Sequence, residues 1–342
     1  MRLIDKPPHP NSADLPAAIP SPLEQVIVYG NPAKKGVVEA LGRLGRWTAE
    51  RGIELSLADD LAALAEAAGV RAATFPAEKE GPSPLANGDT ALLVCLGGDG
   101  TLLHATRRFW PFRTPVLAVN LGMTGFNATV EAGGAIEAVE AWQSGRTRIS
   151  QRMVLKASHL RQQRTINEVA VLNDVVLTKH CDSRLIHLGL SQGREQVADF
   201  AADGLIVATP TGSTAYNLSA GGPIVVPTLR VLIVTAICPH TLTARPVILP
   251  ADAPVQMRFV PHQGRNQAAV LLDGQVEWLI EAEDRIHIEP APEPLRLTVM
   301  EDFEYFSRLR QKLSWSGDAP DIRDGLIRNG SAPSNAHQGD TA

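Results

Sequence analysis

The chain has 342 residues, of which 44% are hydrophobic and 20% are charged, and its formal net charge at pH 7 is −5. This length and composition are typical of a globular enzyme with two domains, and the acidic balance argues against a basic surface for nucleic acid. No apolar run approaches the roughly 18 residues that a membrane-spanning helix needs, so we expect no membrane partner.

Both ends of the chain are predicted to be disordered tails, over residues 1–22 and 317–342. The first is polar and rich in proline and lacks the apolar core of a signal peptide. The second is rich in Gly, Asp, Ser and Asn. The three cysteines, Cys95, Cys181 and Cys238, are widely spaced and odd in number, which predicts reduced, mostly buried thiols in a cytoplasmic protein.

Strand and helix signals alternate over residues 23–148, which predicts an α/β domain. Apolar runs typical of buried strands occupy residues 25–29, 53–57, 92–96 and 116–119. Helical patterns occupy residues 37–48, 60–68, 102–109 and 135–143. Such alternation favours a parallel, Rossmann-like sheet covered on both faces, which binds ligands at the carboxyl ends of its strands.

The pattern changes after about residue 149, where short β-rich runs are separated by turn residues. These runs occupy residues 153–158, 174–179, 185–191, 205–208, 231–237, 255–259, 269–272, 285–288 and 295–299. The strong helix candidate among them lies in residues 214–220. We therefore expect an all-β sandwich over residues 149–300. A helix within residues 301–316 is expected to return to the α/β domain.

The strand over residues 92–96 leads directly into Gly97-Gly98-Asp99-Gly100-Thr101 and then into a helix. Glycines let the backbone approach a ligand closely, and a helix N-terminus attracts an anion. A phosphate would repel Asp99, so this carboxylate is expected either to bridge a metal ion or to meet a hydroxyl that attacks phosphorus. The five residues predict a phosphoryl-transfer loop. An ordinary turn with Asp99 as helix N-cap is equally compatible with the loop alone.

Two further stretches have polar residues where a ligand can use them. Residues 202–223 run from a buried strand through a proline turn into a hydroxyl-rich loop with donors and acceptors suited to a nucleoside. A Ser/Thr-rich surface turn is the alternative. Asn173 and Asp174 open an apolar strand although both types are poor strand residues. The amide can read an adenine edge and the carboxylate a ribose diol, but a polar turn before a strand explains the pair equally well.

Together, these stretches resemble the NAD kinase family. The glycine loop, the Asn173-Asp174 pair, the run over residues 202–223 and the segment over residues 239–246 occur in that order, within a likeness covering residues 25–316. The run over residues 202–223 is the specific signal. The glycine loop is less specific, because diacylglycerol kinases, sphingosine kinases and phosphofructokinases carry similar loops. Neither a P-loop nor a GxGxxG fingerprint is present in the sequence.

The resemblance implies roles for individual residues. Asp99 is the implied catalytic carboxylate, which meets the 2′-hydroxyl of the adenosine ribose. The implied contacts to NAD are Asp99, Gly100, His104, Asn173, Asp174, Arg184, Ala201, Asp203, Thr214, Ala215, Tyr216, Asn217, Leu218, Ser219 and Gln275, and the implied phosphate loop is Gly97, Gly98, Gly100 and Thr101. Locally, a solvated helix histidine and an exposed arginine explain His104 and Arg184 as well. Ala201 stands where many members have Arg or Lys.

The implied activity is transfer of the γ-phosphate of ATP to the 2′-hydroxyl of NAD, giving NADP, with a divalent cation, most plausibly Mg²⁺, whose protein ligands the sequence leaves unknown. An ordinary Asp titrates near pH ~4, so Asp99 is expected to orient the hydroxyl and accept its proton late. One rival is a lipid kinase of the same superfamily, and another is a non-catalytic dinucleotide sensor. A homo-oligomer, dimer or tetramer, is also implied.

Overall fold

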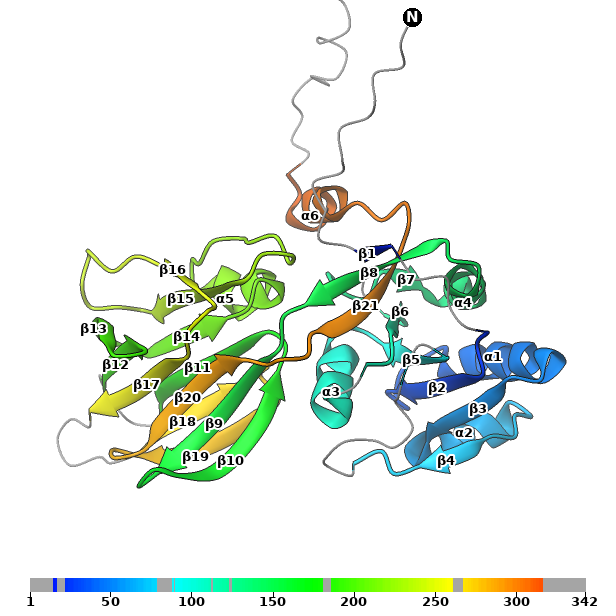
Figure 1. The fold of residues 1–342 in the computed structure, drawn as a ribbon, viewed down its shortest axis with the longest axis horizontal. Coiled ribbons are helices and arrows are strands. Elements are labelled where there is room, and N and C mark those ends of the chain that lie inside the picture. Colours follow the sequence, from blue (N-terminus) through cyan, green and yellow to red (C-terminus); the bar gives the residue numbers. More distant parts are fainter. Residues whose placement is uncertain are drawn as a thin grey trace, which may run out of the picture. The chain divides into compact units, whose positions relative to one another are not determined.

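The computed structural model describes residues 15–16, 22–78, 88, 90–111, 113–122, 125–180, 186–260 and 267–315 (Figure 1). Residues up to Phe303 form one compact unit, and the segment from Glu304 forms a second. The first unit holds a large mixed sheet with helices and two six-stranded sheets. The second holds helix α6 (Tyr305–Leu313), and its return to the α/β domain stays a prediction.

The large sheet is built around parallel, mainly apolar strands. In pairing order these are β6 (Val116–Asn120), β5 (Ala91–Gly97), β2 (Gln25–Gly30), β3 (Glu54–Ala58) and β4 (Ala73–Phe75). Every residue of β5 and β6 is buried, so both faces of the sheet centre are covered. The helices of this domain are α1 (Val37–Arg51), α2 (Ala62–Ala67), α3 (Asp99–Phe109) and α4 (Ala135–Gln143).

The far edge of this sheet is antiparallel and differs from the prediction in two places. Strand β21 (Leu295–Met300) falls in the range predicted for the all-β domain, yet it pairs with β6 and with β8 (Thr147–Arg152), as the orange arrow in Figure 1 shows. Strand β1 (Leu15–Pro16) falls in the predicted disordered tail, yet it pairs with β8. These pairings join residues far apart in sequence, so local patterns do not reveal them. The other residues of both predicted tails, except 22, lie outside the described residues.

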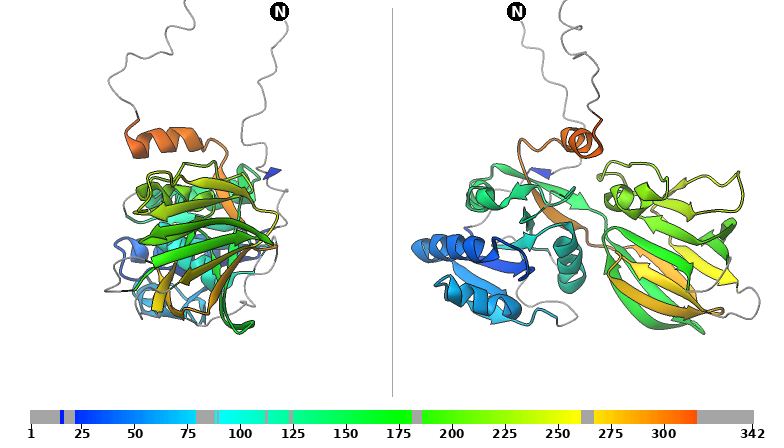
Figure 2. Two further views of the ribbon diagram at one scale, coloured as in Figure 1. Left: turned by 90° about the vertical axis from the view of Figure 1, so that its left-hand side faces the viewer. Right: turned by 180° about the vertical axis from the view of Figure 1, so that it is seen from behind.

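The all-β domain consists of two antiparallel six-stranded sheets, shown from two further sides in Figure 2. One sheet has the order β10 (Arg164–Val171), β9 (Leu155–Arg161), β20 (Arg285–Pro290), β17 (Val255–Val260), β12 (Ile186–Gln192) and β13 (Glu195–Ala202). The other has the order β16 (Val247–Pro250), β15 (Val231–Ile237), β14 (Gly204–Ala208), β11 (Asp174–Lys179), β18 (Gln267–Leu272) and β19 (Val276–Glu281). One apolar core contains side chains from both sheets, as expected of a sandwich.

Two shorter features correct the sequence reading. Helix α3 begins at Asp99 rather than at residue 102, because Thr101 and Leu102 already donate backbone hydrogen bonds to the Gly98 carbonyl (3.0 and 3.1 Å). Cys95 is buried as predicted, whereas Cys238 is exposed, and Cys181 lies outside the described residues. Among the residues that the structure describes, no helix is long and apolar enough to cross a membrane.

Candidate active site

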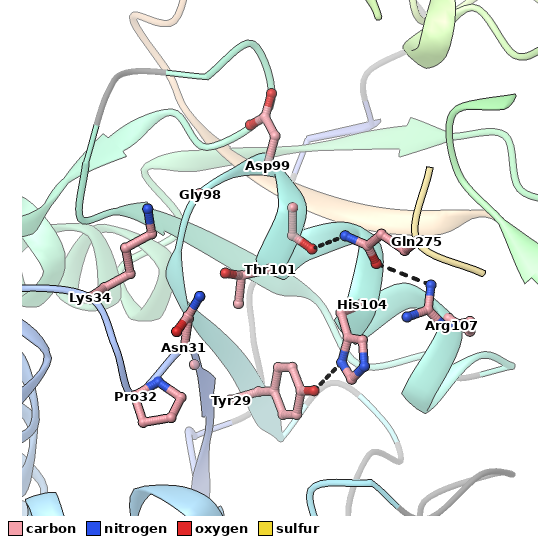
Figure 3. A pocket seen from close by; sticks show the side chains of 12 residues that line it. Tyr29, Asn31, Pro32, Lys34, Gly98, Asp99, Thr101, His104, Arg107 and Gln275 are labelled. Carbon is pink, nitrogen blue, oxygen red and sulfur yellow. Dashed lines mark hydrogen bonds between the residues drawn. The ribbon is translucent and has the colours of Figure 1, made fainter. Parts of the chain in front are cut away.

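A cavity of about 750 Å³ lies at the carboxyl ends of β2 and β5 (Figure 3). Its walls are the segment after β2, the start of α3 and Gln275 from the turn between β18 and β19. Neighbouring parallel strands bring the loops at their carboxyl ends together at one edge. The glycine loop therefore faces the Gly30-Asn31-Pro32 turn, as the sheet order requires.

The glycine loop is shaped by close backbone contacts. A Cβ on Gly97 would overlap the Thr101 side chain, so only glycine lets the chain turn from β5 into α3 here. Gly98 is the helix N-cap residue in an extended conformation, and no side chain caps the helix. Asp99 is thus not an N-cap, and that alternative is wrong. Gly98, Gly100 and Thr101 all line the cavity, where the start of α3 favours negative charge.

The Asp99 carboxylate is anchored by the segment that follows β6. Its oxygens accept backbone hydrogen bonds from Phe126 (2.8 Å), Asn127 (3.1 Å) and Ala128 (2.9 Å). Gly125 permits this approach, because a Cβ there would overlap the carboxylate. In Figure 3 the Asp99 side chain leaves the start of α3 on the side away from Tyr29. Asp99 therefore joins two loops of the site in addition to lining the cavity.

His104 faces the cavity one turn further along α3 and is held by Tyr29 from β2. The Tyr29 hydroxyl and His104 Nδ1 form a hydrogen bond, and the rings stack with centroids 5.7 Å apart. Burial, reinforced by the Arg107 charge, lowers the pKa of His104, and burial also raises the pKa of Tyr29. The imidazole is therefore disposed to be neutral, oriented and available to a polar ligand.

Two cationic side chains that the sequence reasoning missed also line the cavity, Lys34 and Arg107. Lys34 follows the Gly30-Asn31-Pro32 turn at the end of a strand adjacent to β5. The sheet rule that placed the glycine loop could also have placed this turn in the site. Together with the N-terminus of α3, these cations suit a polyphosphate.

The Asn173-Asp174 pair lies at the entry to β11, where it is buried. The Thr209 backbone donates to the Asn173 carbonyl (2.8 Å), and the Thr209 hydroxyl donates to the Leu172 carbonyl (2.6 Å). Within the described residues, Asn173 Oδ1 and Thr211 Oγ1 are buried and have no hydrogen-bond partner. Buried polar atoms are usually paired, and these two oxygens are therefore free to accept hydrogen bonds from a ligand.

Asp273, at the turn after β18, was missed by the sequence reasoning and lies against this pair. Its carboxylate accepts backbone hydrogen bonds from Leu172 (3.0 Å), Asn173 (2.7 Å) and Asp174 (3.2 Å). Burial, with the nearby Asp273 charge, raises the pKa of Asp174 to about 7. Burial raises the pKa of Asp273 to about 6 although these backbone donors oppose the shift.

The loop after β14 forms a 3-10 helix (Thr211–Thr214) and the short helix α5 (Tyr216–Ser219), close to the predicted helix. Asn217 is fully buried, donates to the Ser213 and Pro223 carbonyls (3.1 Å each) and accepts from Thr235 (2.7 Å). Its side-chain amide is therefore used within the protein, and the predicted contact of Asn217 with NAD stays a prediction.

The other residues of this loop remain candidates for binding. Tyr216 and Ser219 are exposed, and Thr214, Ala215 and Leu218 are half-buried. The Ala215 amide donates to Gly212 and the Leu218 amide to Ala215, so these two residues hold the loop backbone. Their predicted contacts with NAD stay predictions.

Asp203 lies at the other end of the β11–β14 pair, and Ala201 lies two residues before it on β13. Asp174 pairs with Ala208, whereas Thr178 pairs with Gly204, so Asp203 is on the far side of the β11–β14 ladder from Asp174. Asp203 Oδ1 lies 2.6 Å from Lys179 Nζ. The structure thus does not bring this part of the predicted site to the cavity that Asp99 lines. Arg184 lies outside the described residues.

Gln275 links the two halves of the predicted site. Its amide nitrogen donates to the Gly100 carbonyl (2.9 Å), and its amide oxygen accepts from Arg107 (3.1 Å), as the dashed lines in Figure 3 show. A parallel sheet with an acidic glycine loop thus meets a β-sandwich that has unpaired buried oxygens. This combination is what is expected of a nucleotide-dependent phosphotransferase.

Comparisons with known proteins identify its family. Residues 26–146 match the ATP-NAD kinase N-terminal domain, and residues 172–299 match the ATP-NAD kinase C-terminal domain. The chain is 40% identical over 238 residues to the NAD kinase of Symbiobacterium thermophilum, covering 70% of this chain and 82% of the relative. It is 35% identical over 295 residues to that of Citrifermentans bemidjiense, covering 86% and 99%.

Solved structures share the fold. Yeast NADH kinase complexed with NADH has a TM-score of 0.77 at 24% identity, over 88% of this chain and 90% of that one. An NAD kinase from Archaeoglobus fulgidus in complex with ATP has a TM-score of 0.63 at 21% identity, over 86% and 100%. The chain belongs to the NAD kinase family. It is a phosphotransferase with NAD kinase function, and the lipid-kinase and sensor alternatives are set aside.

Proposed function

We propose that this enzyme transfers the γ-phosphate of ATP to the 2′-hydroxyl of the adenosine ribose of NAD, with Asp99 as the catalytic carboxylate. The observation that carries the proposal is the position of Asp99, which lines a cavity with Lys34 and Arg107. The turn over residues 273–275 connects that cavity to the Asn173-Asp174 segment, through Gln275 on one side and Asp273 on the other. An acceptor hydroxyl bound on one side can thus approach a phosphate bound on the other.

Within this proposal, the adenosine half of NAD binds at Asn173 and Asp174. The unpaired Asn173 Oδ1 is a suitable acceptor for the adenine amino group, and the Asp174 carboxyl is suited to a ribose hydroxyl. The ATP phosphates occupy the cavity between the start of α3 and the cations Lys34 and Arg107. His104, oriented by Tyr29, supplies a further polar contact there.

Asp99 acts by orientation and late proton acceptance. The backbone donors of residues 126–128 hold the carboxylate in one place, so a hydroxyl that hydrogen-bonds to it is directed toward the bound phosphate. In a loose phosphoryl-transfer transition state the attacking oxygen keeps its proton until late. Its release to Asp99 then accompanies formation of the oxygen–phosphorus bond, and ADP leaves.

The cavity suits Mg²⁺ held mainly by phosphate. Among the described residues, no group of three or more His, Cys, Asp or Glu side chains is placed to bind a metal, and Asp99 is the carboxylate among the residues that line the cavity. Nucleotide-bound Mg²⁺ commonly uses one or two carboxylates plus phosphates and water. The side-chain oxygens of Asn31 and Thr101, which also line the cavity, would hold the ion beside phosphate and water, and it would neutralise phosphate charge when bound.

The test is NADP formation from NAD, ATP and MgCl₂, followed with an NADP-specific dehydrogenase, and the position of the new phosphate determined by ³¹P NMR. We expect a 2′-phosphate and no product when Mg²⁺ is chelated. A parallel reaction with inorganic polyphosphate in place of ATP identifies the donor. Absence of NADP, or a phosphate at another hydroxyl, would contradict the proposal. Homo-oligomer formation and a cytoplasmic location remain predictions.

A further inference from the structure

The turn between β18 and β19, residues 273–275, touches both halves of the site. Asp273 and Gly274 have left-handed backbone conformations (φ 52° and 62°). The backbone N–H of Gln275 donates to the Leu272 carbonyl (3.0 Å). Such a turn favours Asp and Gly because both tolerate positive φ. The backbone of Asp273 and Gln275 is thus fixed in a tight, hydrogen-bonded turn.

Asp273 holds the NAD side of the site. Its buried carboxylate accepts the backbone N–H groups of residues 172–174, and its own N–H donates to the Asp174 carbonyl (2.9 Å). The side chains of Asn173 and Asp174 are left out of these bonds. Asp273 therefore sets where those side chains stand without occupying their binding atoms.

Gln275 holds the phosphate side. It donates to the Gly100 carbonyl and accepts from Arg107. Gly100 follows Asp99 directly, and Arg107 lines the same cavity. Displacement of this side chain would release the first turn of α3 from the β-sandwich at this point.

We propose that residues 273–275 form a brace, in which Asp273 and Gln275 are positioning residues that fix the Asn173-Asp174 segment relative to the glycine loop. The proposal rests on the proposed function, because the two segments then hold the acceptor ribose and the donor phosphate. In-line transfer requires the reacting atoms at about 3–3.5 Å. A rigid link between the segments maintains that separation, and its loss affects both substrates.

The experiment compares Asp273→Asn, Gln275→Glu and the double variant with Glu277→Gln, an exposed position on β19. Gln275→Glu retains an acceptor for Arg107 but removes the donor to Gly100. For Asp273→Asn we expect roughly tenfold weaker NAD binding by calorimetry, with kcat about fivefold lower. For Gln275→Glu we expect kcat about fivefold lower and a KM for NAD about threefold higher.

The decisive result is how the effects combine. If Asp273 and Gln275 act through the same brace, either substitution alone already removes most of its effect. The fold-loss of kcat/KM in the double variant should therefore fall well short of the product of the two single fold-losses. Multiplying losses would overturn the proposal. So would effects of Asp273→Asn confined to NAD binding together with effects of Gln275→Glu confined to ATP.

Hydrogen exchange provides a readout that needs no activity. Asp273→Asn should speed exchange at the amides of residues 98–101, across the brace, relative to Glu277→Gln; unchanged exchange contradicts the brace. If Asp273→Asn does not fold, amide exchange of Gln275→Glu is measured at residues 172–174 instead. Faster exchange there supports the brace, and unchanged exchange contradicts it. If the parent enzyme forms no NADP, the proposed function fails while the exchange data still test the brace.

Discussion

Asp99 combines a structural and a chemical task in one carboxylate. It accepts three backbone hydrogen bonds from the segment after β6 and lines the cavity. A structural anchor tolerates partial replacement by an amide, whereas proton acceptance does not. The two tasks therefore separate in an amide variant, provided that stability and turnover are measured together.

For Asp99→Asn we expect kcat to fall by about 10²–10⁴-fold, the usual contribution of a general base. The amide nitrogen would face a backbone N–H, so unfolding free energy should drop by about 1–3 kcal/mol. NAD affinity should stay within a few-fold. Asp59→Asn is the matched control, because the Asp59 carboxylate also accepts a backbone N–H, from Ala77 (2.9 Å), away from the cavity. Turnover close to that of the parent would remove Asp99 from the chemistry.

Asn173→Ala tests the adenosine contact. Removing the amide leaves a donor of the adenine unpaired in a desolvated site, at a cost of about 1–3 kcal/mol in binding free energy. KM for NAD should therefore rise by roughly 5–150-fold. KM for ATP should move much less. Steady-state kinetics with each substrate varied in turn measures this, with Asn167→Ala on β10 as control. Equal changes in both KM values would mean that Asn173 only shapes the entry to β11.

At the level of elements, the sequence predicts those whose apolar pattern is local. Buried runs identify β2, β5 and β6, and glycine chemistry identifies the β5–α3 junction. Strand β8 was missed because its buried residues include the polar Thr147, Ser150 and Arg152. Strand β10 was missed because its first five residues are exposed. Arg107 and Asp273 could not be predicted because only tertiary pairing brings them to the site, whereas the order of the parallel strands could have placed Lys34 there.

The loop after β14 contains a polar residue that also has a structural role. Its polar residues predict ligand contacts, yet Asn217 makes its bonds inside the protein. Asn217→Ala should lower unfolding free energy by about 2–4 kcal/mol, because it leaves buried partners such as Thr235 unpaired. Ser219→Ala, exposed on the same helix, should leave stability unchanged. Urea denaturation decides, and equal stability of the two variants would contradict the structural role of Asn217.

At the scale of the whole molecule, the buried carboxyl pair Asp174 and Asp273 links stability to pH. An acid whose pKa is raised on folding binds its proton more tightly in the folded chain. The folded state is therefore favoured by this group below the unfolded pKa and loses that advantage as pH rises to the folded value. For Asp174, this window runs from 3.8 to about 7.

Asp174→Asn should consequently stabilise the chain at pH 8 and not at pH 4. One pKa unit corresponds to about 1.4 kcal/mol, so the difference in unfolding free energy between variant and parent should grow by about 2–4 kcal/mol across this range. Comparing the variant with the parent at each pH cancels the titration of other groups. Asp252→Asn, at an exposed aspartate, controls for removing one negative charge. Chemical denaturation without nucleotide measures the effect, and a difference that stays constant from pH 4 to pH 8 would show that Asp174 ionises in the folded protein without penalty.

The Asp174→Asn variant should also bind NAD more weakly if the Asp174 carboxylate of the parent holds the ribose. A gain of stability together with a loss of affinity would mark Asp174 as a residue kept for binding at the expense of the fold.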